Sequence, residues 1–521
     1  DYRPAPPCLA DACFQAKALV AGIPEDHKTS NATSKNKLLK YGEQYTSQQK
    51  IQRPSDDPTV AVRSLKLRTT YSQVTQYVEK NVQDALNWMD MTEGALTNIG
   101  KMLTTMKGFL VQGNVDEMEA DQRKSVIQTL KKNVEGIFES EANADYSGRY
   151  LFTGYRTDTS LLFPEVTDNL EYKITEKFTY DSFRNVTSVI GGPSYSTDTG
   201  TGQDYVDNAA TTTTAYRLQL AYNNCATEVN FETGMDEAIQ FTFTNKEGED
   251  VTDDILTGDL RIELSTSSST VRQVADDEVL YLYDTGEVLV GKDVFNAIQE
   301  NQATINVDYL KSEFKQFDVR PEMYFKAECY NTVTEKSIKY SEPADQTIRY
   351  EVNFNQTINV NTQARDAIST DIYRTIEYIE QNIQYLDEAE TKIEECEKLI
   401  KNTTDEDELA KLKTLKIQLE DEKQLRVKVL SESFGIGLTM IDNVQVKLDI
   451  AVADLGAKYN RTQLTYDKLL DTRLDTEDKL SENEGVDLPD VLINMTQANN
   501  LYQASLSATS KILGNSLLNY I

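Results

Sequence analysis

The sequence has little of what catalytic and metal sites commonly use. It contains one histidine, His27, and one tryptophan, Trp88, among 521 residues. Histidine is the commonest general base and the commonest zinc ligand near neutral pH. Because the single histidine lies in an atypical N-terminal stretch, Ser–His–Asp, Cys–His and H-E-x-x-H sites are excluded. We expect no enzyme, no catalytic residue, no metal site and no cofactor.

Cysteines are few and widely spaced. They are Cys8, Cys13, Cys225, Cys329 and Cys396. Their number is odd and no C-x-x-C pair occurs, so the pattern predicts neither a zinc site nor a disulfide framework. We interpret them as isolated thiols.

Long apolar runs and excess positive charge are also missing. No stretch of 18 apolar residues occurs, so no transmembrane helix is expected. The stretch Cys8–Ile23 contains Asp11 and Lys17 and is a poor signal peptide, so a secreted chain of this kind needs a dedicated export route. The net charge of −32 repels nucleic acid and anionic lipid, so we expect neither as a partner.

The residue patterns that are present divide the chain into three zones. Residues 33–155 are typical of helix, 156–362 of strands and turns, and 363–521 of helix again. The predicted fold class is α+β: a long antiparallel helical bundle or coiled coil built from both termini, with a β-rich domain inserted in the middle. The predicted domains are an atypical, disordered or artefactual extension (1–32), an incomplete N-terminal helix (33–57), a first helical half (58–155), a β-rich variable domain (156–362), a second helical half (363–486) with a helical excursion near 387–430, and a C-terminal helix (487–521).

A helix break begins the first helical half. It consists of Arg53, Pro54, Ser55, Asp56, Asp57 and Pro58. Asp57 is a suitable N-cap, and Pro58 suits the first helical position, where its missing N–H has no partner to lose. Beyond it, apolar residues at steps of three and four predict a buried seam on a long helix that ends at Gly113-Asn114, with Asp116 opening the next. The seam is Val78, Val82, Ala85, Met89, Thr92, Leu96, Ile99, Leu103, Met106 and Leu110.

The third zone carries matching stripes. Ile372, Ile376, Ile379, Ile383 and Leu386 form one, and a second runs from Leu448 to Leu469. The last stripe reaches almost to the end of the sequence, where little chain is left to cover it, so we assign it to contacts between molecules. The predicted assembly residues are Leu488, Leu492, Met495, Tyr502, Leu506, Leu513, Leu517 and Tyr520.

The middle zone alternates apolar and polar residues. Runs at 239–243, 260–264 and 350–354 predict half-buried strands. The stretch Ser194–Thr214 is rich in Thr, Asp and Gly and is predicted to be a loop.

Several short motifs resemble the flagellin superfamily, and within it the hook-associated protein 3 family of hook–filament junction proteins. The first two motifs are Ile51–Pro58 and Tyr150–Tyr155. The third, Tyr350–Thr362, is similar to the segment where the chain of these proteins returns from the variable domain to the helical domain. The fourth, Leu455–Arg461, is similar to the family's "lGaryNR" segment. The ending Ser516–Tyr520 is similar to that of the junction proteins and differs from the usual flagellin ending. The resemblance covers about residues 35–160 and 345–521.

This resemblance implies a structural subunit of the bacterial flagellum that joins hook to filament through its terminal helices. It implies hook-associated protein 1 and flagellin as neighbours, a flagellar export chaperone, self-association in a ring, and an extracellular location reached by flagellar type III export. Two alternatives stay open: a flagellin filament subunit, or an adhesin-like binding protein that uses the β-rich domain.

Two acidic patterns resemble known functional sites. The triplets Asp198–Gly200 and Asp284–Gly286 have the D-T-G form of aspartic proteases, but such triplets also close turns, and we favour turns. The segment Glu247–Asp254 is rich in carboxylates without EF-hand spacing, so we interpret it as a solvated loop instead of a Ca²⁺ site.

Overall fold

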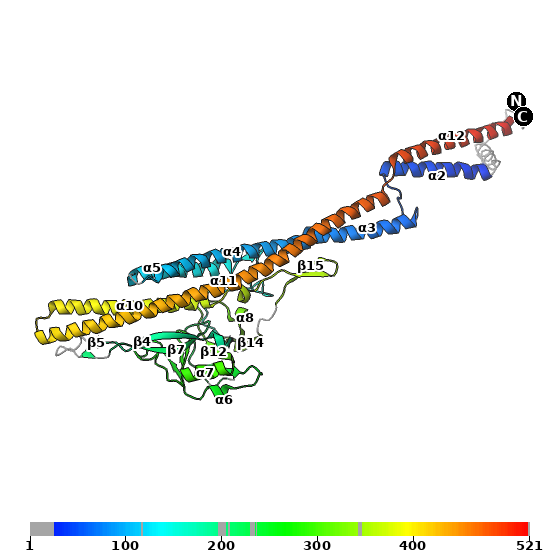
Figure 1. The fold of residues 1–521 in the computed structure, drawn as a ribbon. Helices are drawn as coiled ribbons and strands as arrows, with labels where there is room; N and C mark the ends of the chain where they lie inside the picture. The colour runs from blue at the N-terminus through cyan, green and yellow to red at the C-terminus, as the bar shows by residue number, and fades with distance from the viewer. Residues whose placement is uncertain are drawn as a thin grey trace, which may run out of the picture. The chain divides into compact units, whose positions relative to one another are not determined.

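The computed structural model describes residues 25–115, 118–195, 205–206, 209–229, 235, 237–341 and 346–518 (Figure 1). The chain forms two compact units. The first comprises residues up to 83, residues 351–356 and residues from 463 onward; the second comprises residues 84–350 and 357–462.

In the first unit, the two terminal helices lie side by side. Helix α2 (Glu25–Ser47) runs antiparallel to α12 (Leu488–Leu518), and the Ser505 hydroxyl donates to Asn31 Oδ1 at 2.6 Å. Helix α2 begins at Glu25, ahead of the predicted boundary at residue 33, so the later part of the expected extension is helical. Its residues 1–24 lie outside the described part of the chain.

The same unit contains a second antiparallel pair. Helix α3 (Pro58–Gln76) and a π-helical turn at Tyr77–Asn81 lie beside the end of α11 (Glu406–Glu484). Asn483 Nδ2 donates to Ser64 Oγ at 2.7 Å, and Arg473 contacts Glu79 at 3.3 Å. The hairpin of β15 (Arg349–Asn353) and β16 (Gln356–Asn359) joins this unit through its tip.

Long helices form one half of the second unit. They are α4 (Val82–Gly113), α5 (Ala120–Glu135), the π-helical turn Gly136–Glu141, α10 (Asp371–Asn402) and the 79-residue α11. All ten residues of the seam predicted from Val78 to Leu110 are buried, as are the five predicted in α10. Helix α4 ends at Gly113, where a Cβ would lie 2.6 Å from the buried ring of Phe434. The predicted helix start at Asp116 lies outside the described residues.

The helical excursion is a hairpin made by the end of α10 and the start of α11. Its interior is a small apolar cluster of Cys396, Leu412, Leu415 and Leu419. The surrounding surface is charged, and Lys416 contacts Glu397 at 2.8 Å.

The β-rich domain is the other half of the second unit. The inner sheet has the order β4-β7-β11-β10-β9, and the outer sheet has the order β14-β13-β3-β12-β8. The inner-sheet strands are β4 (Arg184–Ile190), β7 (Thr211–Gln219), β9 (Leu260–Glu263), β10 (Val279–Leu282) and β11 (Glu287–Val290). The outer-sheet strands are β3 (Leu170–Thr179), β8 (Ile239–Thr244), β12 (Thr304–Lys311), β13 (Lys326–Asn331) and β14 (Lys336–Tyr340).

Shorter elements complete the domain and its connections. They are β1 (Asp145–Tyr146), β2 (Arg149–Tyr150), β5 (Ser194–Tyr195), β6 (Tyr205–Val206), the 3-10 turn Tyr180–Ser182, α6 (Thr252–Ile255), α7 (Lys292–Glu300), α8 (Pro321–Tyr324) and α9 (Ala364–Ala367).

The fold class predicted from the sequence is confirmed, and the alternating runs at 239–243 and 260–264 form β8 and β9. The predicted loop Ser194–Thr214 is wrong in two places. Its first residues form β5, which pairs with β6 at Tyr205–Val206, and Thr211 to Thr214 begin β7 and pair with β4. Threonine is β-branched and favours strands, and the neighbouring strand outweighed the polar composition.

The two sheets enclose one core. Leu218, Tyr281 and Val288 of the inner sheet face Ile174 and Val307 of the outer sheet. The other side of the inner sheet presents Leu280, Leu282 and Leu289, which form a second cluster with Ile436 of α11 packed against it. The inner sheet is therefore buried on both faces, between the helices and the outer sheet.

The core holds an acid that burial keeps protonated. Glu176 accepts from the Ala221 amide at 2.9 Å and from the Tyr309 hydroxyl. Burial raises the pKa of Glu176 to about 8, although both hydrogen bonds act to lower it. Because the unfolded chain titrates near 4.5, this group favours the folded state most below that pH, and its contribution declines as pH rises toward 8.

We therefore expect Glu176→Gln to stabilise the β-rich domain at pH 8 and to change little at pH 4. The pKa shift from 4.5 to about 8, at about 1.4 kcal/mol for each unit, corresponds to a gain in unfolding free energy of about 4–5 kcal/mol at pH 8. Urea unfolding at the two pH values measures it, with exposed Glu247→Gln as the matched control. A loss of stability at pH 8 would contradict the protonated state of Glu176.

Candidate functional site

The predicted assembly stripe on α12 lies at the edge of its contact with α2. The residues buried against α2 are Val491 and Ala498, and Met495 and Tyr502 are half-buried. Leu488, Leu492 and Leu506 remain 38%, 46% and 44% exposed. The side chains of Leu513 and Leu517, and all of Tyr520, lie outside the described residues. The role of this stripe in assembly stays a prediction.

The terminal pair thus buries Val491 and Ala498 and leaves three leucines of α12 partly exposed. We name Leu488, Leu492 and Leu506 the leucine edge; they share one side of the helix because 18 residues make five turns. Leu39 of α2, and Ile493 and Leu501 of α12, are exposed as well. Full burial of one leucine contributes about 1.5–3 kcal/mol. An edge of this kind gains stability when another apolar surface covers it.

The predicted helix break consists of two successive aspartate caps. Asp56 Oδ2 accepts from the amides of Gln52 and Arg53, at 3.0 and 2.8 Å, and these bonds lower the pKa of Asp56. Asp57 Oδ1 accepts from the amides of Thr59 and Val60, at 2.9 and 3.2 Å. Asp57 is the N-cap of α3, and Pro58 occupies its first turn, as the sequence predicted.

In the first unit, the connection between α2 and α3 lies beside the connection between α11 and α12. The Lys50 amide donates to the Glu484 carbonyl at 2.7 Å, and the Val486 amide donates to the Gln48 carbonyl at 3.2 Å. Arg68 holds the Glu484 carboxylate with two bonds of 2.7 Å, which lower the pKa of Glu484. These contacts fix the α2–α3 connection to the α11–α12 connection.

A hollow of about 390 Å³ lies beside this junction. It is lined by Ile51, Arg53, Pro54, Val62, Leu65 and Arg68, among others. Val62 and Leu65 are exposed, and Ser55 is exposed in the same segment. The break motif therefore borders a part-apolar surface in addition to ending one helix and starting the next.

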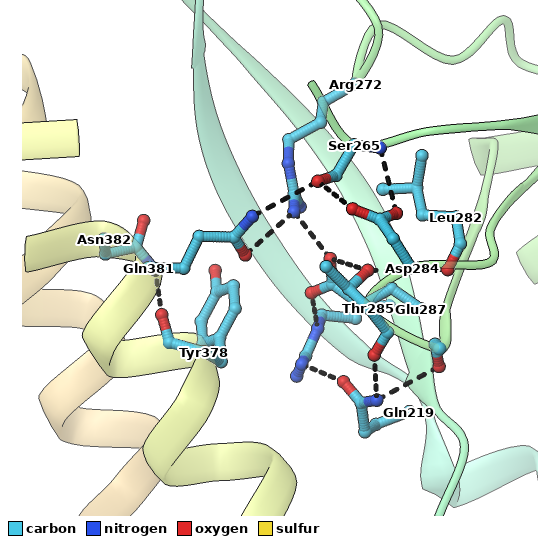
Figure 2. Close-up of polar contacts among 12 residues, drawn as sticks. Gln219, Ser265, Arg272, Leu282, Asp284, Thr285, Glu287, Tyr378, Gln381 and Asn382 are labelled. Atoms are coloured by element: carbon cyan, nitrogen blue, oxygen red, sulfur yellow. Dashed lines mark hydrogen bonds and ion pairs between the residues drawn. The ribbon is translucent and has the colours of Figure 1, made fainter. Parts of the chain in front are cut away.

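A buried polar cluster joins the inner sheet to α10 (Figure 2). Glu287 contacts Arg272 at 2.6 Å and also Arg217, and all three side chains are almost completely buried. Burial alone would raise the pKa of Glu287, but Arg272 and Arg217 bring it down to about 2. The guanidinium of Arg217 also lies 4.1 Å from the ring centre of Tyr378 on α10.

Gln381 of α10 completes the contact. Its amide nitrogen donates to the Ser265 hydroxyl at 3.4 Å, and its oxygen accepts from Arg272 at 3.5 Å (Figure 2). A charged network at an interface fixes the relative position of two elements, because sliding one past the other leaves buried charges unpaired. We name Arg217, Arg272, Glu287 and Gln381 the sheet–helix clamp.

The Asp284–Gly286 triplet is part of a turn. It connects β10 to β11, and Asp284 accepts from the amide and the hydroxyl of Ser265. Gly286 has φ +67°, and a Cβ there would lie 2.0 Å from the Tyr222 carbonyl oxygen. The other triplet, at 198–200, lies outside the described residues. The geometry of Asp284 supports the interpretation of this triplet as a turn.

The acidic segment 247–254 follows β8. Asp250 accepts from the amide and the hydroxyl of Thr252, and Asn245 Oδ1 accepts from the Glu249 amide at 2.8 Å. Within the described part of the chain, no group of three or more His, Cys, Asp or Glu side chains is placed to hold a metal ion. Likewise, no helix among the described residues combines the length and apolar character needed to cross a membrane.

Reasoning from sequence missed the sheet–helix clamp. Its one visible signal is Glu287, a charged residue at the start of the run Glu287–Val290 that is buried throughout. A carboxylate in such a run needs a buried cation, but the sequence does not indicate which arginine supplies it.

Comparison with known proteins agrees with the helical ends. Residues 25–157 match the bacterial flagellin N-terminal helical region, and residues 438–521 match the bacterial flagellin C-terminal helical region. Flagellar hook-associated protein 3 of Escherichia coli K12 is 25% identical over 127 residues, which are 24% of this chain and 40% of that protein. Its counterpart from Salmonella typhimurium LT2 is 24% identical over 136 residues, which are 26% of this chain and 43% of that protein.

These alignments span about two fifths of the length of the curated relatives. A solved structure of flagellar hook-associated protein 3 from Legionella pneumophila covers 80% of this chain and 98% of its own, at 11% identity and a TM-score of 0.28.

The two ends of the chain are thus similar to the terminal helical regions of bacterial flagellin. Within that class, the chain resembles flagellar hook-associated protein 3, which confirms the resemblance found in the sequence motifs.

Proposed function

We propose that this chain is a structural subunit of the bacterial flagellum that joins the hook to the filament. The observation that carries the proposal is the terminal helix pair, α2 and α12. It belongs to the matched flagellin-type regions, and it leaves the leucine edge exposed. In this role the edge is buried against the same helices of neighbouring subunits.

The proposed partners follow from that position. Hook-associated protein 1 lies on the hook side and flagellin on the filament side, while copies of this chain associate in a ring. Before assembly, an export chaperone covers the terminal helices, and the flagellar type III route carries the chain to the cell exterior. The leucine edge supports these proposals, because a chain with exposed apolar termini needs protection before it reaches its site.

The role is that of a structural protein without catalysis. The Asp284 carboxylate is engaged with Ser265 in a turn, and the buried acid Glu176 lies in the core between the sheets. Neither observation supports a reacting centre.

The alternative of an adhesin-like protein depends on the β-rich domain. Deleting residues 165–345 separates the two functions, because a junction subunit keeps its terminal helices without that domain. We expect cells that carry the deletion to build filaments. Electron microscopy of filament number per cell measures the result, with the full chain as control. Loss of filaments despite normal export of the shortened chain would favour a structural requirement for the β-rich domain and contradict this division of roles.

The remaining alternative is a flagellin filament subunit. The matches to hook-associated protein 3, together with the ending at Ser516–Tyr520, favour the junction.

A further inference from the structure

The outer sheet has one face that neither the core nor the helices cover. Its inward residues Ile174, Val307 and Ala327 belong to the shared core. The inner sheet separates this core from Ile436 of α11. The alternate residues of β3, β12 and β13 therefore point away from the helices, and apart from Leu310, which is buried, they carry polar groups.

Strand register brings these polar residues together in two rows. Thr175 of β3 lies between Lys326 of β13 and Asp308 of β12. In the next row, Asn306 of β12 lies between Lys177 of β3 and Thr242 of β8. Residues paired across strands have Cβ atoms about 4.5–5.5 Å apart, so a single small molecule can contact several of them.

The two rows line a hollow of about 530 Å³. The lining side chains from the rows are Thr175, Lys177, Thr242, Asn306, Asp308 and Lys326. Pockets for small ligands commonly measure about 300–1,000 Å³. The hollow is thus large enough for one or two sugar rings, and it is built on strands, which hold side chains in fixed positions.

The hollow carries an excess of positive charge. Asp308 is paired with Lys173 at 3.0 Å, which leaves that carboxylate neutralised. Lys177 and Lys326 form no ion pair with any side chain in the described part of the molecule. In a chain of net charge −32, two ammonium groups without a partner at one hollow favour a ligand that brings negative charge.

Tyr324 and Phe325 complete the lining, and the polar groups of the two rows define the rest of the ligand. Two threonine hydroxyls and the Asn306 amide both donate and accept hydrogen bonds, which suits a molecule rich in hydroxyl groups. An apolar ligand would leave these groups unpaired, and a divalent cation would find its only carboxylate already engaged by Lys173. We propose that this hollow binds an anionic saccharide, with Lys177 and Lys326 holding the carboxylate of a uronic acid unit and Asn306 and the threonines holding its hydroxyls.

Calorimetric titration of the full chain with tetragalacturonate tests the proposal. Binding is expected to weaken about a hundredfold in Lys177→Gln/Lys326→Gln, because the variant removes two charge-assisted bonds and each is worth about a factor of ten. The matched control, Lys246→Gln/Lys336→Gln, removes the same charge from exposed lysines outside the hollow and should bind like the parent chain. Asn306→Ala should weaken binding several-fold without changing its salt dependence.

Three results would overturn the proposal. The first is the absence of binding by tetragalacturonate to the parent chain, and the second is equal binding by both double variants. The third is competition by neutral maltotetraose or by inorganic phosphate at the same concentration, which would indicate a site that does not require both the carboxylate and the sugar. Thermal unfolding of each variant confirms that its fold is intact before the titration.

Discussion

Replacing the leucine edge with glutamine is expected to abolish incorporation at the junction while leaving the monomer folded. Leu488, Leu492 and Leu506 are 38–46% exposed at one side of α12, so their replacement removes only part of the contact between α2 and α12. Glutamine is nearly as favourable in a helix as leucine, so α12 is preserved. In an assembly, burying the 38–46% of these three leucines that is still exposed contributes about 2–4 kcal/mol for each subunit, which is enough to change whether it is retained.

The measurement is filament number per cell in a strain that lacks its own copy of the gene, with circular dichroism of the purified variant. The matched control changes three exposed apolar residues of the β-rich domain, Leu264, Val333 and Ile338, to glutamine. That control should build normal filaments. Removing residues 489–521 should give the same loss as the leucine variant. Normal filaments from either one would disprove the assembly role of α12.

Glu287→Gln is expected to destabilise the β-rich domain by about 3–5 kcal/mol. The substitution keeps the shape of the side chain but leaves the buried guanidinium groups of Arg217 and Arg272 without a counter-charge. Urea unfolding, together with hydrogen exchange of the β10 and β11 amides, measures the loss. The control Glu380→Gln breaks a half-exposed pair with Lys131 and should cost less than about 1 kcal/mol.

The pH dependence of the clamp has a definite sign. The folded pKa of Glu287 lies near 2 and its unfolded value near 4.5, so the stabilisation is present above pH 4.5 and is lost as pH falls through about 2. The parent chain should therefore lose stability across this range more steeply than Glu287→Gln. Parallel acid unfolding curves for the two proteins would contradict the ionised clamp.

The helical ends were predictable from the sequence because the apolar spacing of three and four residues is repeated many times along them. Each residue from Val78 to Leu110 at the expected spacing is buried, and no single residue decides the pattern. The cap at Asp57 and Pro58 was predictable for a different reason, since its hydrogen bonds are local in sequence.

The candidate sites were less predictable because they depend on distant pairings. Arg272 and Glu287 meet only after β9, β10 and β11 have paired and α10 has packed on them. The same holds for the polar hollow, where Lys326 and Thr175 become neighbours through the register of β13 and β3. For α12, the stripe was visible but not which side of it α2 would cover, since Val491 and Ala498 pack there in place of the larger leucines.

Three thiols are buried in different parts of the second unit. Each can react only after the structure around it opens, so its reactivity reports local unfolding. Cys225 and Cys329 lie in the β-rich domain and Cys396 in the helical excursion, all buried and unpaired. Burial raises the pKa of Cys225 to about 11, and it also raises the pKa values of Cys329 and Cys396, so the nucleophilic thiolate is scarce in the folded state. Alkylation of each in turn, in a Cys8→Ser/Cys13→Ser background, would time which part of the molecule opens first and which last during unfolding in urea.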